Sequence, residues 1–396
     1  MTISISCEVL VLGAGSAGLA AAVTAARSGV SVIVVERHGF AGGMGTASLV
    51  HTFCGLYLPG EGPPVVANEG FPAEMEERMR LATGLGPVKM GRVWVLPQHP
   101  VEFVRIADGL FKEASVRVLY HAEALRAARD ADGWQVSAAC RGGQMSIRAK
   151  AVVDASGDAV FAALAGAETS LTEAARLQRP AYIFGVQGVT NGESGLVLAG
   201  RLVEGIRRGV LSKETLGLHF RASGREGEIF GTIDLSGSEE GRDYDPLDPA
   251  CLSRLEGAGR ELAAAAIAYL KKEAEGWNGA YISHWPVRAG VRESRRWIGK
   301  HVLTGEEILT GARHDDEIAL ATWPLELRET NRGPKLRYPE NDAAAGIPLR
   351  ALVPANLEGV FMAGRCISCD HEAQASIRVM GTCFATGQAA GRAAVC

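Results

Sequence analysis

Hydrophobic and polar positions near the start of the chain follow the pattern of a strand, a helix and a second strand. Residues 9–12 are a continuous apolar run typical of a buried strand, residues 19–27 are rich in alanine and predict a helix, and residues 32–35 predict the second strand. A membrane helix over residues 9–26 is an alternative, because this stretch carries no charge. The glycines within it and the lack of a basic flank favour the strand and helix, and therefore an α/β fold.

The turn between the first strand and the helix carries glycines in the spacing G-x-G-x-x-G. Gly13 permits the tight turn, Gly15 lets a pyrophosphate approach the backbone, and Gly18 lets helix and strand pack closely. The free amides at the start of the helix then face the negative charge. Glu36 ends the second strand, where a carboxylate accepts hydrogen bonds from ribose hydroxyls and disfavours a 2′-phosphate. The unit predicts a dinucleotide site, and a buried hairpin without a ligand is the alternative.

The pattern changes to short alternating runs between residues 116 and 154. Residues 116–121, 134–139 and 144–154 are separated by turns rich in Asp and Gly, and they predict a three-stranded meander. A strand–helix–strand unit followed by a meander, rather than by a second nucleotide-binding half, is a distinct topology. Elsewhere the pattern predicts helices over residues 72–82, 101–114, 194–208 and 251–275, and strands over residues 179–189 and 229–235.

Length and composition set the broad class of the protein. The 396 residues are enough for two domains, and a net charge of −4 with 22% charged residues gives no reason to expect a nucleic-acid partner. No basic segment precedes the first strand, so we expect neither a signal peptide nor an integral membrane segment. The eight cysteines are scattered through apolar segments, which suits a reduced cytoplasm. We therefore expect a cytoplasmic protein, and leave open whether it is a homo-oligomer.

A family resemblance becomes specific at the end of the chain, which reads GVFMAGRCISCDHEAQASIRVMGTCFATGQAAGRAA over residues 359–394. The other motifs are VLGAGSAGLAAA, ERHGFAGGMGT, VVDASGDAVFAALAG and AGVRESRRWIGKHVLTGEEIL. Together they resemble the FAD-dependent oxidoreductases of the glutathione-reductase superfamily. More narrowly, they resemble the branch with GGM, GVRESRR and AGRCIS…SIRVM motifs, which is related to the fumarate-reductase flavoproteins.

The resemblance implies a Rossmann-like FAD-binding domain, a ββα sandwich with a three-stranded meander, and an inserted α+β domain that caps the substrate site. On this basis we expect the FAD-binding domain to comprise residues 1–58, 101–166 and 347–396. The cap would then comprise residues 59–100 and 167–346. No second G-x-G-x-x-G follows a strand, so a built-in NAD(P)H site is not expected.

The resemblance also implies which residues contact FAD. Binding is expected to be noncovalent, because no histidine lies in the turn of residues 42–46, where flavinylated relatives carry one. Arg365 replaces the aspartate of the superfamily's Gly-Asp pair, and amides near Val379 and Met380 would point at flavin N1 and O2. The expected cofactor residues are Gly13, Gly15, Ser16, Ala17, Gly18, Glu36, Arg37, Gly42, Gly43, Met44, Thr46, Ala124, Ala155, Gly157, Asp158, Gly364, Arg365, Arg378, Val379 and Met380.

Candidate catalytic residues lie close to the expected flavin. His371 and Glu372 are placed in the loop before the last helix, where an imidazole would exchange the proton that accompanies hydride transfer. The alternative for His371 is a hydrogen bond to the loop backbone or to FAD. Arg292 would anchor a substrate carboxylate or oxyanion, and its alternative is an ion pair with the pyrophosphate or with an interdomain carboxylate.

Cysteine spacing does not change this interpretation. Cys366 and Cys369 form a C-x-x-C, but they leave a strand into a loop and no second pair completes a zinc site. We therefore expect neither a functional dithiol nor a metal site.

The sequence thus predicts an FAD-dependent oxidoreductase that moves a hydride between flavin N5 and a small organic substrate, with oxygen, a quinone or another external electron acceptor or donor. A flavin monooxygenase, an NAD-binding protein similar to thiazole synthase and a non-catalytic FAD-binding scaffold are the alternatives. The substrate and the direction of transfer stay open.

Overall fold

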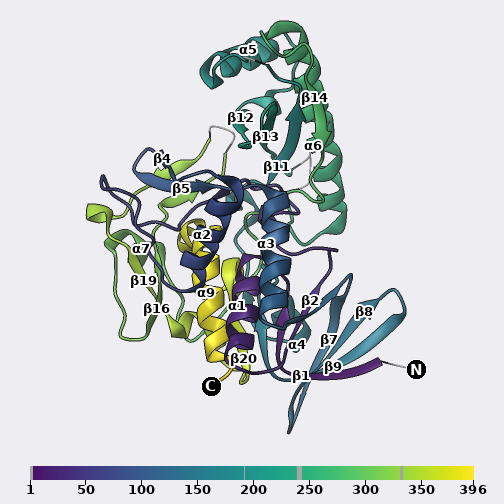
Figure 1. The fold of residues 1–396 in the computed structure, drawn as a ribbon, viewed down its shortest axis with the longest axis vertical. Coiled ribbons are helices and arrows are strands. Elements are labelled where there is room, and N and C mark those ends of the chain that lie inside the picture. Colours follow the sequence, from purple (N-terminus) through teal and green to yellow (C-terminus); the bar gives the residue numbers. More distant parts are fainter. Residues whose placement is uncertain (1–2, 191, 239–242, 331–332) are drawn as a thin grey trace.

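The computed structural model describes residues 3–190, 192–238, 243–330 and 333–396. Figure 1 shows two parts, a lower one built around a large sheet and central helices, and an upper one that carries α5, α6 and a smaller sheet. Within the described residues, no helix has both the length and the apolar character needed to cross a bilayer.

The large sheet has seven strands, and its parallel half contains the predicted strand–helix–strand unit. β1 (Ile3–Leu12) lies between β2 (Val32–Glu36) and β9 (Gly143–Asp154), and both pair with it in parallel. β6 (Arg117–Tyr120) extends the sheet beyond β2, and β20 (Val360–Met362) pairs with β9. Every residue of β2 is buried, as is typical of a parallel strand that is covered on both faces. The prediction of the parallel unit is confirmed.

The structure contains a three-stranded meander, but one of its three strands is not the one that was predicted. Its strands are β7 (Glu123–Asp130), β8 (Gly133–Cys140) and β9, joined antiparallel. The predicted first run, residues 116–121, instead forms β6, which pairs in parallel with β2. β7 escaped prediction because it lies at the edge of the sheet with most of its side chains exposed, so no apolar alternation marks it.

The first and last helices of the chain pack at backbone distance. α1 (Ser16–Arg27) lies beside α9 (Met380–Ala393) in the middle of the lower part (Figure 1). A Cβ added at Gly387 would lie 2.1 Å from the Ala17 carbonyl oxygen, and one added at Gly391 would lie 2.4 Å from that of Ala21. These two contacts advance together along both helices, so the helices are parallel. Glycine is needed at both positions because any side chain would separate the helices.

The other predicted helices are confirmed with small changes of their bounds: α2 (Phe71–Thr83), α3 (Pro100–Glu113), α5 (Gly195–Arg207) and α6 (Pro249–Glu273). The shorter elements are β3 (Thr52–Phe53), β4 (Val88–Met90), β5 (Val93–Pro97), α4 (Val160–Ala165), β10 (Thr169–Ser170), β15 (Arg296–Trp297), α7 (Gly305–Thr310), β16 (Glu317–Ala321), β17 (Leu325–Leu327), β18 (Lys335–Arg337), β19 (Ala345–Pro348) and α8 (His371–Ile377).

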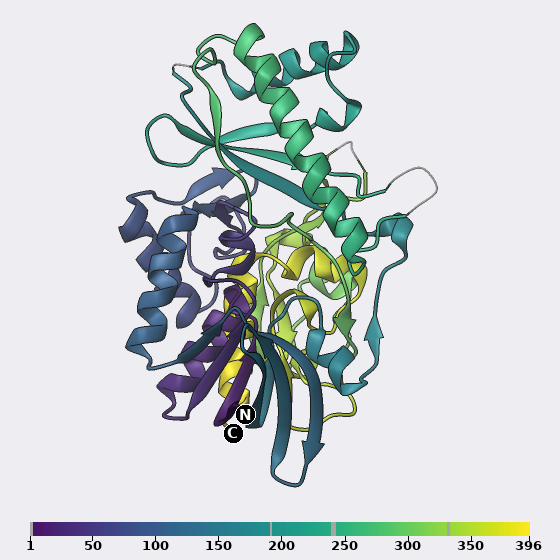
Figure 2. The same ribbon diagram turned by 90° about the vertical axis from the view of Figure 1, so that its right-hand side faces the viewer.

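The upper part, which we call the cap, is a four-stranded antiparallel sheet with α6 along one side (Figure 2). Its strands follow the order β12 (His219–Ala222), β13 (Glu228–Asp234), β11 (Ala181–Gln187) and β14 (Tyr281–His284). The strands predicted over residues 179–189 and 229–235 are therefore confirmed as β11 and β13. The cap has its own buried cluster, which includes Tyr182, Phe184, Leu255 and Trp277.

The two buried cores divide the chain differently from the predicted domains. Phe71, Met75 and Met79 on α2 belong to the main core, although residues 59–100 were expected in the cap. Leu303 and Ile347, from the later part of the predicted cap, also belong to the main core. The cap's own core draws on residues between 177 and 289. The inserted segments on either side of that range pack their apolar faces on the lower part instead.

The helix contact leads to a stability prediction. Gly387→Ala should lower the free energy of unfolding by at least about 2 kcal/mol, because the new methyl group overlaps the α1 backbone. Gly257→Ala is the control: Gly257 lies on α6 with no atom within 4 Å of an added Cβ, so alanine should stabilise the protein by about 0.5–1 kcal/mol. Urea denaturation of both variants checks this. Equal stability of the two would show that α1 and α9 do not pack at backbone distance.

Candidate functional site

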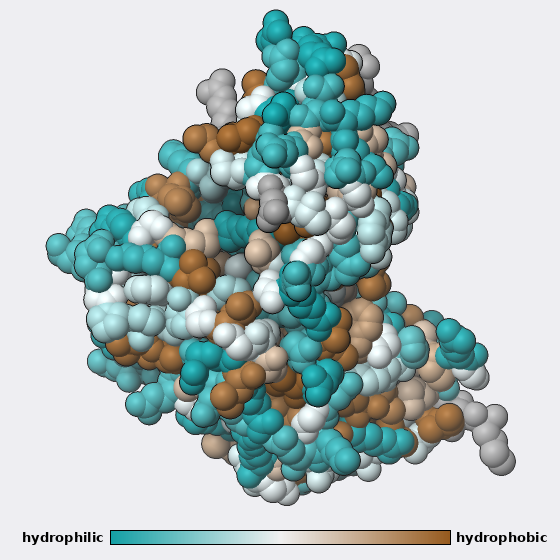
Figure 3. Space-filling model, turned by 45° about the horizontal axis from the view of Figure 1, so that its top comes forward, coloured by the Kyte–Doolittle hydropathy of each residue, from teal (hydrophilic) through white to brown (hydrophobic). Residues whose placement is uncertain are grey.

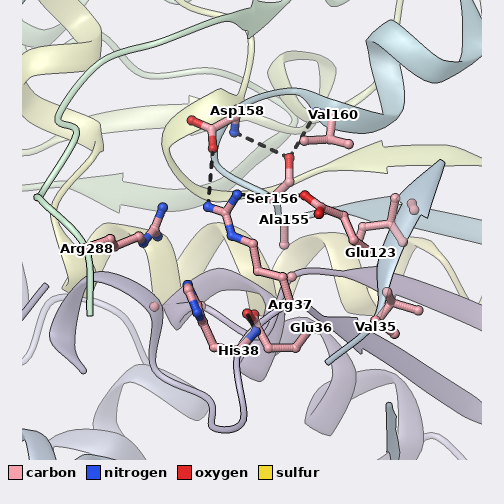
Figure 4. A pocket seen from close by; sticks show the side chains of 16 residues that line it. Val35, Glu36, Arg37, His38, Glu123, Ala155, Ser156, Asp158, Val160 and Arg288 are labelled. Carbon is pink, nitrogen blue, oxygen red and sulfur yellow. Dashed lines mark hydrogen bonds and ion pairs between the residues drawn. The ribbon is translucent and has the colours of Figure 1, made fainter. Parts of the chain in front are cut away.

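Three adjoining cavities form one long cleft that begins at the carboxyl ends of the parallel strands. The first cavity, of about 80 Å³, is lined by residues that follow β1, β2 and β9, among them Gly13, Glu36 and Asp158 (Figure 4). The second shares Gly15 and Arg288 with the first. The third, of about 190 Å³, shares four residues with the second: Met44, Arg365, Arg378 and Met380. A long ligand would therefore run from Glu36 past the start of α1 to the start of α9.

Two glycine turns bring backbone up to this cleft. Gly13 has φ of +90°, and the amide of Gly42 donates to the Ala14 carbonyl at 2.8 Å, which joins the two turns. A Cβ added at Gly43 would lie 2.8 Å from the Cα of Gly15. The absence of side chains here leaves room for a ligand to approach the backbone.

Most of the predicted cofactor residues line the cleft, and three do not. Gly18 packs against β1, where an added Cβ would lie 1.8 Å from the Gly13 carbonyl oxygen, so its predicted packing role agrees with the structure. Gly42 and Thr46 belong to the second glycine turn but do not line the cleft, and Thr46 Oγ1 donates to the Ala41 carbonyl at 2.8 Å. Thr46 is therefore a structural residue of the turn, and its predicted contact with the cofactor is not seen in the geometry. The predicted residues that line the cleft are Gly13, Gly15, Ser16, Ala17, Glu36, Arg37, Gly43, Met44, Ala124, Ala155, Gly157, Asp158, Gly364, Arg365, Arg378, Val379 and Met380.

Glu36 lies at the end of the cleft that the first cavity forms. Its carboxylate is buried and accepts the Ala14 amide at 2.7 Å and the His38 amide at 2.9 Å. The same carboxylate lines the first cavity, so it holds the glycine turn and also faces a ligand. The Nε2 atom of His38, another lining residue, is buried without a hydrogen-bond partner in the described part of the chain.

Guanidinium groups outnumber carboxylates in the middle of the cleft. Arg365 pairs with Asp158 at 2.5 Å, and Arg37 lies 3.9 Å from the same carboxylate (Figure 4). Burial by itself raises the pKa of Asp158, but the charges of Arg365 and Arg288 have the larger effect and lower the pKa to about 2. Burial and the nearby Arg37 lower the pKa of Arg288 to about 10, so Arg288 stays charged at neutral pH. Among the described residues, the second cavity is lined by Arg288, Arg365 and Arg378 and by no carboxylate, so positive charge is left there for a diphosphate to neutralise.

Sequence reasoning did not single out Arg288. Its Nε atom is buried without a hydrogen-bond partner among the described residues, and it lines both the first and the second cavity. Its position just before the AGVRESRR motif was the available signal. The sequence alone does not distinguish Arg288 from an arginine on the surface. The fold places it in the first cavity together with Val35 and Glu36 of β2.

The third cavity lies between the cap and the lower part, where the surface is hollowed (Figure 3). Its apolar wall includes Ile183 of the cap sheet, together with Trp323 and Val379. Among the described residues its polar wall carries five arginines, and three of them are already paired with carboxylates: Arg292, Arg328 and Arg365, the last with Asp158. Arg292 donates to Asp234 at 2.7 Å and to the Arg179 carbonyl, and Arg328 pairs with Asp234 and Glu326 at 2.6 and 2.7 Å. Arg292 therefore lines the cavity as predicted, but its charge is compensated.

Two other arginines in this cavity keep spare donors. The one hydrogen bond that the described structure gives the Arg221 side chain is to the sulfur of Met90, at 3.3 Å. Arg378 has a buried Nε without a partner and lies 3.9 Å from the Glu326 carboxylate. Burial lowers the pKa of Arg378 to about 10, with Glu326 opposing that shift, so the group is charged at neutral pH. An anion in the cavity would accept hydrogen bonds from the spare donors of both side chains.

His371 and Glu372 do not occupy the predicted place. They begin α8 rather than lying in a loop, and neither lines any of the three cavities. The ring nitrogens of His371 lie 2.9 Å from Glu293 and 2.9 Å from Glu329, while Glu372 pairs with Arg337 at 2.8 Å. Burial lowers the pKa of His371, but the two carboxylates raise it more, so the net shift is upward. The predicted loop is wrong, since both residues begin α8, and neither side chain lines the cleft in this structure.

The histidine that does line the third cavity is His219 on β12. Its Nδ1 lies 3.1 Å from the Gly217 carbonyl, so Nδ1 carries the proton and Nε2 is left as an acceptor. Burial lowers the pKa of His219. Cys54 also lines this cavity, and burial raises the pKa of its thiol to about 12, so it is not a thiolate at neutral pH. Cys366 and Cys369 are buried free cysteines outside the cleft.

The chain was compared with known proteins. Residues 8–396 match the family described as FAD dependent oxidoreductase. No curated protein sequence matches the chain. A geranylgeranyl bacteriochlorophyll reductase-like protein from Thermoplasma acidophilum is similar in structure, with a TM-score of 0.50, 13% identity, and coverage of 98% of this chain and 78% of that one. The flavin-dependent brominase Bmp2 has a TM-score of 0.48 and 10% identity, over 98% of this chain and 79% of that one. At 13% identity the likeness to the reductase-like protein shows the fold alone.

The family and the cleft agree on the cofactor, which is FAD. The cleft offers a carboxylate at one end, glycine turns with surplus positive charge in the middle, and a helix N-terminus at the other end. These are the chemical groups that a ribose, a diphosphate and a flavin ring need.

The cluster of cations gives a binding prediction. Arg288→Gln should weaken FAD binding at least about tenfold, since the variant loses a charged donor to the diphosphate. Arg141→Gln, in the exposed turn between β8 and β9, is the matched control and should bind FAD like the unchanged protein. Titration of the apoprotein with FAD, followed by flavin fluorescence, measures both. Unchanged affinity in Arg288→Gln would remove Arg288 from the site.

Proposed function

Because this chain belongs to the FAD-dependent oxidoreductase family, we propose that it moves a hydride between flavin N5 and a small organic substrate that carries a carboxylate or a similar anion. The observation that supports this is the third cavity, which lies at the Met44 and Met380 end of the cofactor cleft and holds two arginines with spare donors. The narrower placement, in the branch related to the fumarate-reductase flavoproteins, stays a prediction from the motifs.

The bound FAD supplies the hydride chemistry. The chain orients the substrate, stabilises charge and excludes water. Val379 precedes α9 without any side-chain cap. The Gly381 amide donates to the Cys54 carbonyl at 2.9 Å, and the other amides of this first turn would stabilise negative charge on the flavin ring. Ile183 and the rest of the cap sheet cover the substrate side and exclude water. Arg221 and Arg378 would hold the substrate anion and so orient the reacting carbon.

His219 takes the place that sequence reasoning gave to His371. With Nδ1 held by the Gly217 carbonyl, its Nε2 is free to take the proton of a substrate N–H or O–H group during oxidation, or to return it during reduction. Its lowered pKa keeps the ring neutral at pH 7, which is the form that a proton acceptor needs. An external acceptor or donor, such as oxygen or a quinone, would complete the turnover.

The substrate class is tested by anaerobic bleaching of the flavin absorbance. Among amines, hydroxy acids and enoates, compounds with a free carboxylate should react, and their esters or amides should react far more slowly. Bleaching by neutral compounds alone would refute the anionic substrate, and hydroxylation that depends on oxygen and NADPH would assign a monooxygenase instead.

The two arginines give a matched pair of variants. Arg221→Gln and Arg378→Gln should each raise KM for the anionic substrate by about 10–100-fold, because a charged hydrogen bond contributes about 1.5–3 kcal/mol. Arg225→Gln is the control, since Arg225 is paired with Glu102 outside the cavity. Steady-state kinetics with the acid and with its ester separate the effects: the ester should respond little to either variant. Equal losses for acid and ester would mean that the arginines do not bind the anion.

His219 gives a prediction about pH. In the oxidation direction kcat should fall as the pH drops through the pKa of His219, which burial places below the usual 6.5. His219→Gln should lower kcat about 10²-fold or more and remove this acid limb. His284→Gln, a cap histidine that does not line the cavity, should retain both the rate and the limb. An unchanged acid limb in His219→Gln would assign proton transfer to another group.

A further inference from the structure

Three side chains with metal-binding atoms converge around α7, and none of them lines the FAD cleft. His301 precedes the helix, Glu307 lies on it, and His314 follows it. One ligand atom from each lies within 4.8 Å of the other two. Within the described residues, this is the one group of three His, Cys, Asp or Glu side chains with that property.

These atoms lie close enough together for one ion to bind all three, with His301 and Glu307 hydrogen-bonded in its absence. His301 Nε2 lies 2.9 Å from Glu307 Oε1, and His314 Nε2 lies 3.3 Å from the same oxygen. Metal–ligand bonds of ~2.0–2.1 Å in a tetrahedral site place neighbouring ligand atoms about 3.3 Å apart. His314 Nε2 is buried and has no hydrogen-bond partner among the described residues, so its lone pair or proton is unused there.

Glu307 is held so that one oxygen faces the histidines. Its Oε2 accepts the Thr304 amide at 2.7 Å and the Thr304 hydroxyl at 2.8 Å, in a capping box at the start of α7. This leaves Oε1 for the two imidazoles. Such supporting hydrogen bonds orient the ligands of many metal sites.

The backbone on both sides of α7 is also fixed. The amide of His301 donates to the Arg350 carbonyl at 3.2 Å, and the amide of Glu317 donates to the His314 carbonyl at 3.2 Å. Two nearby cations are paired: Arg350 with Asp316 at 3.0 Å and Arg313 with Glu317 at 2.5 Å, which limits their repulsion of an ion. The three ligand side chains are 12–23% exposed, so an ion and a water molecule can reach them from the surface.

We propose that His301, Glu307 and His314 form a binding site for one divalent transition-metal ion, with Zn²⁺ as the best match to two imidazoles and a carboxylate. A water molecule completes the coordination. This differs from the expectation of no metal drawn from cysteine spacing, because the site contains no cysteine. The ion ties the two ends of α7 together, and Gly305 at the start of that helix donates to Asp370, which caps α8.

The test is a Zn²⁺ titration of the full FAD-loaded chain without a histidine tag, in competition with a chromophoric chelator. The unchanged protein should bind one Zn²⁺ with a Kd below about 1 μM. His314→Gln and Glu307→Gln should each weaken binding at least tenfold. Glu306→Gln is the matched control: Glu306 is exposed in the same turn and is not one of the three converging ligands, so its affinity should not change.

Stability provides the second readout. Zn²⁺ should raise Tm of the unchanged protein and of Glu306→Gln by several degrees, and should not raise that of His314→Gln. Glutamine at position 307 can still form the capping box, and His301→Gln replaces either variant that fails to fold. Binding of less than 0.2 equivalents of Zn²⁺ by the unchanged protein, or equal affinity in all variants, would overturn the proposal. The flavin spectrum without metal should be the same in every variant, so this outcome is independent of the redox function.

Discussion

The parallel contact between α1 and α9 is the constraint on which the cofactor cleft depends. Ala17 is the second residue of α1, whereas its contact Gly387 is the eighth residue of α9. α9 therefore extends beyond the start of α1 by six residues, or about 9 Å. Two helix N-termini are thus presented to one cleft at different depths, the first beside the glycine turn and the second beside Met380. The spacing suits a ligand that carries negative charge at two separate places.

Charge pairing decides what each arginine in the cleft can do. Buried guanidinium groups are costly unless a carboxylate or a ligand compensates them. Asp234 compensates Arg292 and Arg328, which makes these two a rigid part of the wall. Among the described residues no carboxylate lies as close to Arg221 or Arg378, so these two would gain most from a substrate anion. The same reasoning distinguishes Arg288, for which the described part of the chain provides no ion pair, from Arg365, which is paired with Asp158.

The position of the substrate cavity follows from how the chain is divided between two cores. The apolar faces of α2 and of the segments after the cap belong to the main core, so they support the cofactor cleft from below. The cap buries its own cluster and covers the cavity with one face of its sheet. Because both cores are closed, the space between them is left for a ligand, as is common where two packed units meet.

The sequence by itself determined the strand–turn–helix–strand unit, the long helices and the family, because glycine spacing and apolar periodicity act over neighbouring residues. Most of the cofactor residues that it proposed, from Gly13 to Met380, also line the cleft. Only the tertiary structure decided which candidates carry compensated charges and which face the cavity. His371 has Glu293 and Glu329 as partners, and His219 lines the cavity instead. The physical reason is that charge pairing, burial and the convergence of side chains depend on residues far apart in the chain, which no local pattern records.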